Sequence, residues 1–168
     1  MKKEKGMNMT GKDKSFTENL DEIIKQLEIK NFNVAEASAK NLESEYPNYS
    51  SYQRGYLLDY CIGQAIFRSK IENSDDDMDA INEAIKYFDK SVSQNPNFDD
   101  AHLFLGFSYN MKQSIMIAKG FPGKDEILNY NELALKHLDI ARKFNPNYKI
   151  YVDCMIENLI QSRRKVLN

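Results

Sequence analysis

The two histidines of the chain, His102 and His137, have the most versatile side chains for catalysis or metal binding. Each lies among apolar residues at helical spacing. An imidazole that works as a general base or as a metal ligand needs a nucleophile, an acid or further ligands beside it. The sequence around these two histidines offers no such pattern. We interpret both as packing residues and predict a non-catalytic chain that holds no metal and no cofactor.

Three alternating aspartates, Asp75, Asp77 and Asp79, resemble the start of a calcium-binding loop. Such a loop needs a glycine after its third acidic position and a bidentate glutamate near its end. Ala80 and Lys86 stand at these two positions. The aspartates are therefore better explained as the acidic start of a helix, where carboxylates accept hydrogen bonds from the first backbone N–H groups.

The remaining reactive groups also lack a functional pattern. Residues 120–124 contain two glycines and a lysine, but without the spacing of a phosphate-binding loop. Cys61 and Cys154 fall on separate predicted helices, with no CxxC and no metal-ligand spacing. Unpaired thiols are the usual state in a reducing compartment, so we expect a cytoplasmic protein without a disulfide.

Composition limits the class of protein. The chain has 168 residues, 42% hydrophobic and 29% charged, with a formal net charge of −2. These values are typical of one globular domain. The charge provides no basic face for a nucleic acid, and no apolar run reaches the roughly 18 residues of a membrane span. Residues 1–14 are lysine-rich and lack the apolar stretch of a secretory signal, so we expect a flexible tail before a helical domain at 15–168.

A repeated proline turn organises that domain. Pro47, Pro96 and Pro146 each follow an apolar helical stripe and stand 49 and 50 residues apart. Proline cannot extend a helix and moves the preceding residue out of helical geometry, so each stripe ends there. Three copies at near-constant spacing indicate an all-α solenoid of stacked helix pairs. The stripes predict seven antiparallel helices, at about 15–30, 35–46, 52–71, 79–94, 99–119, 125–144 and 148–166.

The residues around the middle turn resemble a tetratricopeptide repeat. The second helix of such a repeat carries a small, an aromatic and a small residue before the proline turn, as Ala84, Phe88 and Ser91 do before Pro96. The first helix carries Leu-Gly followed by Tyr, and Leu105-Gly106 with Tyr109 matches this pattern. Tyr56-Leu57 with Tyr60 matches it more weakly. The resemblance covers about residues 17–167 and implies a right-handed superhelix. The family's repeat is about 34 residues long. The spacing here therefore places extra residues at the hairpin tips and predicts elongated helices.

In this family the first helix of each pair lines a concave groove that binds a protein segment. The corresponding inner-face residues are our predicted partner-binding set: Arg54, Leu58, Ile62, Leu103, Phe107, Asn110, Met111, Asp153 and Glu157. The positions that match the family's carboxylate clamp keep only the charge of Arg54, so we expect no such clamp. Because the helix at 99–119 is apolar almost all round, its residues line a groove or are buried by neighbouring helices.

We therefore predict a protein–protein interaction adaptor that binds an apolar or helical peptide segment in its groove. A carrier of a small apolar or carboxylate ligand is the alternative, with a cavity around Tyr60, Phe107 and Met111 and with Arg54 orienting the carboxylate. A third reading is a homo-oligomer formed through the same apolar stripe.

Overall fold

The structure is a computed structural model that describes residues 11–71, 77–120 and 123–167. Over these residues the chain is all-helical, and no strand is present. The seven α-helices are α1 (Gly11–Glu28), α2 (Phe32–Glu45), α3 (Gly55–Ile66), α4 (Met78–Gln94), α5 (Asp99–Ala118), α6 (Lys124–Phe144) and α7 (Lys149–Leu167). A π-helical turn, Phe67–Ile71, continues α3. None of the described helices combines the length and apolar character needed to cross a lipid bilayer.

The Asn-Pro turns end their helices as the sequence predicts. α4 ends at Gln94 and α6 at Phe144, one residue before the asparagine in each case. The Asn145 side chain then accepts a hydrogen bond from the backbone N–H of Asn147 at 3.1 Å. This bond stabilises the turn that proline forces, because it satisfies a backbone donor just outside the helix.

Two helix starts differ from the prediction. α1 begins at Gly11, so residues 11–14, assigned to the flexible tail, are helical, and residues 1–10 lie outside the described residues. The helix predicted from Tyr52 begins only at Gly55. A Cβ atom at Gly55 would stand 2.2 Å from the Tyr49 carbonyl oxygen, so the chain folds tightly back on itself there. That close contact needs glycine and delays the helix.

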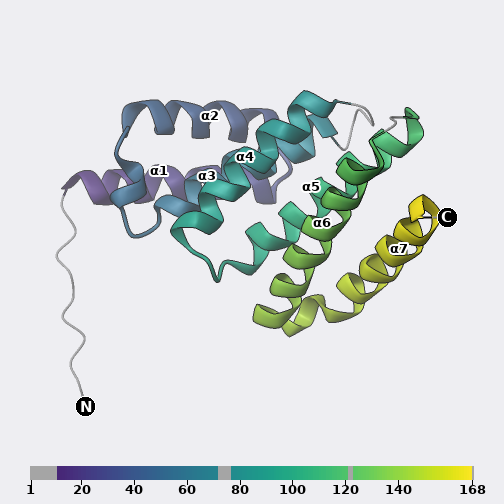
Figure 1. The fold of residues 1–168 in the computed structure, drawn as a ribbon. Coiled ribbons are helices and arrows are strands. Elements are labelled where there is room, and N and C mark those ends of the chain that lie inside the picture. The colour runs from purple at the N-terminus through teal and green to yellow at the C-terminus, as the bar shows by residue number, and fades with distance from the viewer. Residues whose placement is uncertain (1–10, 72–76, 121–122, 168) are drawn as a thin grey trace, which may run out of the picture.

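Consecutive helices pack side by side along the whole chain, and neighbours in sequence lie next to one another in Figure 1. Glycine makes the closest of these contacts within two pairs. A Cβ atom at Gly63 of α3 would stand 2.8 Å from the Phe88 ring of α4. One at Gly106 of α5 would stand 2.6 Å from Cγ of Leu138 on α6. In both pairs a large apolar side chain therefore occupies the space that the missing Cβ leaves.

Side chains also connect every second helix. The contacts between α1, α3, α5 and α7 are the Asp21–Arg54 ion pair at 2.7 Å, the Tyr60 and Phe104 rings at 5.9 Å, and the Phe107 and Tyr151 rings at 5.5 Å. On the other side, α2 and α4 are joined by the Lys40–Glu83 ion pair at 2.9 Å. We call the surface formed by α1, α3, α5 and α7 the odd-helix face.

The last helix is held by a polar contact as well as by apolar ones. Val152 and Leu159 of α7 are fully buried against α5 and α6. Between them and the rest of the core lies Asn131 of α6, whose amide nitrogen donates to the Leu159 carbonyl at 2.9 Å and to Gln113 Oε1 at 3.2 Å. This bridge links α7 to α5 and α6, although Asn131 Oδ1 and Gln113 Nε2 are buried without a hydrogen-bond partner among the described residues.

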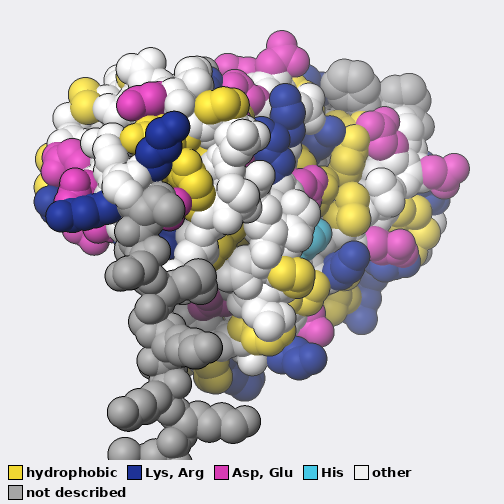
Figure 2. Space-filling model, turned by 90° about the vertical axis from the view of Figure 1, so that its left-hand side faces the viewer, with side chains coloured by type: hydrophobic (Ala, Val, Ile, Leu, Met, Phe, Trp, Pro, Cys, Tyr) yellow, Lys and Arg dark blue, Asp and Glu magenta, His cyan; other side chains and the backbone are white. Residues whose placement is uncertain are grey.

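Charged groups of both signs are spread over the view in Figure 2, with small hydrophobic patches between them. The larger apolar side chains exposed in the described residues include four on α7: Ile150, Tyr151, Ile160 and Leu167.

The glycine contact predicts a stability effect. Gly106→Ala should lower the free energy of unfolding by roughly 1–3 kcal/mol, because the added methyl overlaps the buried Leu138 side chain. Urea denaturation followed by circular dichroism measures this. The control is Gly11→Ala, where a Cβ would meet no atom within 4 Å.

The overlap also predicts the behaviour of a double variant. In a Leu138→Ala background the added methyl has room, so the same glycine substitution should cost less or stabilise, as alanine is the better helix former. If Gly106→Ala lowered the free energy of unfolding equally in both backgrounds, the close contact with Leu138 would not determine its effect.

Candidate functional site

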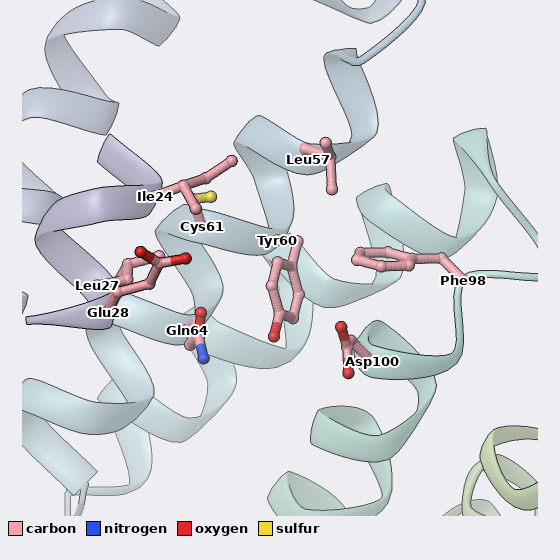
Figure 3. A pocket seen from close by; sticks show the side chains of 9 residues that line it. All are labelled: Ile24, Leu27, Glu28, Leu57, Tyr60, Cys61, Gln64, Phe98 and Asp100. Atoms are coloured by element: carbon pink, nitrogen blue, oxygen red, sulfur yellow. The ribbon is translucent and has the colours of Figure 1, made fainter. Parts of the chain in front are cut away.

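The odd-helix face carries two neighbouring hollows. The first lies between α1, α3 and α5 and has a volume of about 270 Å³. Figure 3 shows its lining, with Tyr60 near the centre and Phe98 and Asp100 on the side opposite to α1. The nine lining residues are Ile24, Leu27, Glu28, Leu57, Tyr60, Cys61, Gln64, Phe98 and Asp100. The floor of this hollow is therefore apolar and aromatic, while its edges are polar.

The charge at the edges of the first hollow is negative. Glu28 and Asp100 are its two ionisable carboxylates, and no lysine or arginine is among its nine lining residues. Burial raises the pKa of Asp100, and the hydrogen bond from the Tyr148 hydroxyl acts in the opposite direction. Burial also raises the pKa of the Cys61 thiol to about 12, so this thiol is protonated and unreactive at neutral pH.

The second hollow lies between the π-helical turn, α5 and α7 and has a volume of about 260 Å³. Its lining is mostly aromatic and methionine side chains: Phe67, Arg68, Phe104, Phe107, Asn110, Met111, Tyr151 and Met155. The Arg68 guanidinium carbon lies 5.5 Å from the centre of the Phe104 ring. The second hollow is thus an apolar site with a cation at its edge.

The two hollows adjoin each other. On α3 and its continuation, the residues lining both fall at three- or four-residue intervals, from Leu57 through Cys61 and Gln64 to Arg68. This spacing places them on one side of the helix. Tyr60 of the first hollow contacts Phe104 of the second, with ring centres 5.9 Å apart. Together the hollows form one surface, with two carboxylates at one part and a guanidinium at the other.

The structure places three of the predicted binding residues in the second hollow: Phe107, Asn110 and Met111. Three others are core residues. Leu58 and Ile62 have no exposed surface, and Leu103 is 8% exposed in the cluster that includes Leu138 and Val152. The interpretation of these three as groove-lining is corrected: α3 is rotated so that Leu57, Tyr60 and Gln64 line the hollow in place of Leu58 and Ile62, and Leu103 of α5 packs against α6 and α7.

The charged residues of the predicted set lie outside both hollows. Arg54 donates to Asp21 at 2.7 Å, so its charge is already paired within the chain. Asp153 accepts from Arg142 and Lys149, which lowers its pKa. Glu157 is exposed and lines neither hollow.

The first hollow includes residues that the sequence prediction missed. Ile24, Leu27 and Glu28 come from α1, and Phe98 comes from the Pro96 turn. The apolar residues of α1 were recognised, but only as a core stripe. The sequence held one partial sign that α1 contributes to the hollow: the charged Glu28 directly follows the buried Leu27 at the end of that stripe.

The two histidines contact each other. Their Nδ1 atoms are 2.9 Å apart, and His102 Nε2 lies 3.0 Å from the Pro96 carbonyl oxygen. A carbonyl only accepts, so His102 donates from Nε2 and neutral His102 accepts at Nδ1 from His137. Tyr109 stacks on His137 with ring centres 5.9 Å apart. The pair therefore joins α5 to α6.

The acidic start of α4 is an ordinary helix cap. Asp77 is the N-cap residue and accepts from the backbone N–H of Ala80 at 2.9 Å. Asp79 is exposed in the first turn, and Asp75 lies outside the described residues. Within the described part of the chain, no group of three or more histidine, cysteine, aspartate or glutamate side chains is arranged to hold a metal ion.

No protein-family model, no curated protein and no solved structure matches this chain. The hollows of the odd-helix face are therefore the features from which a function can be inferred.

The histidine pair predicts a pH dependence of stability. Burial, with the nearby charges of His102 and Lys136, lowers the pKa of His137 to about 4 from its ordinary value of 6.5. The unfolded chain then takes up a proton before the folded chain does. The free energy of unfolding should fall by up to about 3 kcal/mol as pH drops from about 6.5 to about 4. Urea denaturation at several pH values measures this fall.

A matched variant isolates the contribution of His137. His137→Asn keeps a donor near the position of Nδ1 but does not titrate, so its stability should fall less over the same pH range. Because Asp59 and other buried carboxyl groups titrate in both proteins, only the difference between them reports on His137. Parallel curves for the two proteins would contradict this account.

Proposed function

We propose that this chain is a tetratricopeptide-like binding module, a right-handed helical solenoid that holds a segment of another protein on its odd-helix face. The observation that carries the proposal is the pair of adjoining hollows, which combine an aromatic and methionine-rich floor with polar edges. Aromatic and methionine side chains are enriched where proteins bind one another, because they supply large apolar area and adapt their packing.

The repeat geometry supports the same proposal. Helix pairs follow one another, and the glycine-to-large-side-chain contact of α3 and α4 recurs in α5 and α6. Stacked helix pairs create an extended surface from the first helix of each pair, and such surfaces suit extended or helical segments. The two free thiols, Cys61 and Cys154, are consistent with the proposed cytoplasmic location.

The hollows favour a protein segment over a small ligand. Their volumes of about 270 and 260 Å³ lie near the lower limit of the roughly 300–1,000 Å³ of typical small-molecule pockets. Tyr60 lines one hollow, whereas Phe107 and Met111 line the other, so these three residues do not surround one cavity. Arg54, the predicted partner for a ligand carboxylate, is engaged by Asp21.

Site-specific photo-crosslinking tests the proposal. A photoreactive phenylalanine analogue replaces Tyr151, which is 57% exposed beside the second hollow. The same analogue replaces Phe144 in a control; that side chain is 43% exposed at the end of α6 and lines neither hollow. In lysate of the cells that naturally express the chain, we expect a protein to be crosslinked from position 151 and not from position 144.

Two results would contradict the proposal. One is equal crosslinking from both positions, or none from position 151. The other is a small molecule retained by the purified chain in native mass spectrometry and lost from a Tyr60→Ala or Met111→Ala variant that remains folded. That result would favour the ligand carrier.

A further inference from the structure

We propose that the first hollow receives a lysine or arginine side chain of the bound segment, between the carboxylates of Glu28 and Asp100, while apolar side chains of the same segment occupy the second hollow. This inference rests on the proposed function and names the chemistry of the partner. It is carried by the carboxylates that line the first hollow and by the polar groups there that have no partner among the described residues.

The two carboxylates are placed to bind a cation. Glu28 and Asp100 lie on opposite sides of the first hollow, with Tyr60 and Gln64 between them (Figure 3). Glu28 is exposed and forms no ion pair or hydrogen bond with the described residues. Asp100 is half-buried and accepts one hydrogen bond, from Tyr148, through Oδ1. A cation placed between them would reduce the cost of burying the Asp100 charge.

The remaining lining suits the same side chain. Tyr60 and Phe98 meet edge to face with ring centres 4.9 Å apart, and both are half-buried. Ring faces attract cations, and apolar walls accommodate the methylene stem of lysine or arginine. The Tyr60 hydroxyl and the Gln64 amide make no hydrogen bond with the described residues, so both can accept from a bound ammonium or guanidinium.

No lysine or arginine lines the first hollow, although the charges of Arg68 and Arg54 act on Tyr60 and Cys61 there. Arg54 is paired with Asp21, and Lys25 with Glu22. Arg68 belongs to the second hollow, where it lies over Phe104. An acidic side chain in the first hollow would meet two carboxylates, whereas a basic one would be attracted by them. The carboxylates of the first hollow therefore favour a basic residue of the bound segment at this position.

The spacing of the hollows predicts the spacing of residues in the segment. Tyr60 and Phe67 are seven residues apart on α3 and its continuation, which corresponds to a rise of about 10 Å. An extended segment covers this distance with about three residues and a helical one with about seven. Bound segments should therefore place an apolar residue at one of these separations from the basic residue.

Selection from a random peptide display library tests the inference without knowledge of the natural partner. The full chain is compared with the double variant Glu28→Gln/Asp100→Asn. The control is Asp79→Asn/Asp125→Asn, which makes the same change in net charge at exposed positions in the first turns of α4 and α6. Circular dichroism and urea denaturation establish that all three proteins are folded.

We expect the wild type and the control to enrich peptides with lysine or arginine at the predicted separation from apolar residues. The double variant should lose the basic preference. It should also bind a selected peptide at least about tenfold more weakly in fluorescence anisotropy, because two charge-assisted contacts are removed. Added salt should weaken the wild type towards the variant.

The other outcomes separate the two proposals. Enrichment of apolar peptides without a basic residue, or an equal basic preference in the double variant, would overturn this inference and leave the proposed function standing. No enriched peptide in any of the three proteins would overturn both. A wild-type dimer in sedimentation velocity that the double variant abolishes would assign the surface to a second copy of the chain, again overturning the inference.

Discussion

The close approach of paired helices at glycine is the constraint on which the rest of the structure depends. Gly63 admits the Phe88 ring, and Gly106 admits the Leu138 side chain, at separations that a Cβ atom would forbid. Because the residues that make these contacts are almost completely buried, the pairs are fixed in register and in crossing position. α3, α5 and α7 then meet one another through aromatic rings. Rings that meet edge to face leave hollows beside them, and the candidate site consists of two such hollows.

The polar interactions of the fold reinforce the proline turns. Asn145 donates to Asp99 at 2.8 Å, and the Tyr148 hydroxyl donates to Asp100, so the third turn is tied to the start of α5 just after the second. This contact also positions Asp100 at the edge of the first hollow. A residue that ties the third proline turn to α5 therefore also supplies one of the two charges in the proposed binding surface.

The helices could be predicted well from sequence because their limits depend on local chemistry. The Pro turns, the acidic cap at Asp77 and the glycine that follows α5 act over a few residues, and α4 to α7 begin and end close to the predicted positions. The pairing register was harder to predict. The resemblance to the tetratricopeptide marks matched Leu57 with Gly106, whereas Gly63 makes the corresponding close contact in the structure. The difference arises because the two hairpins differ in where their helices cross, which no local pattern encodes.

The rotation of α3 about its own axis explains most of the error in the predicted site. Apolar residues occur on all sides of this helix, so periodicity does not identify the exposed side. Leu58 and Ile62 were expected in the groove, yet both are fully buried, and the residues beside them face the hollow. On α5 the prediction was closer, since Phe107, Asn110 and Met111 line the second hollow. The contribution of α1 depends on how α1 packs against α3, a long-range contact that the sequence does not reveal.

The most direct test of the central claim is a backbone amide chemical-shift map of the full chain, titrated with a peptide selected on the wild type. The account predicts that the largest shifts fall on the odd-helix face, at Glu28 and Gln64 beside the first hollow and at Phe107 and Met111 beside the second. Shifts concentrated on α2, α4 and α6 would contradict it, since these helices contribute no residue to either hollow.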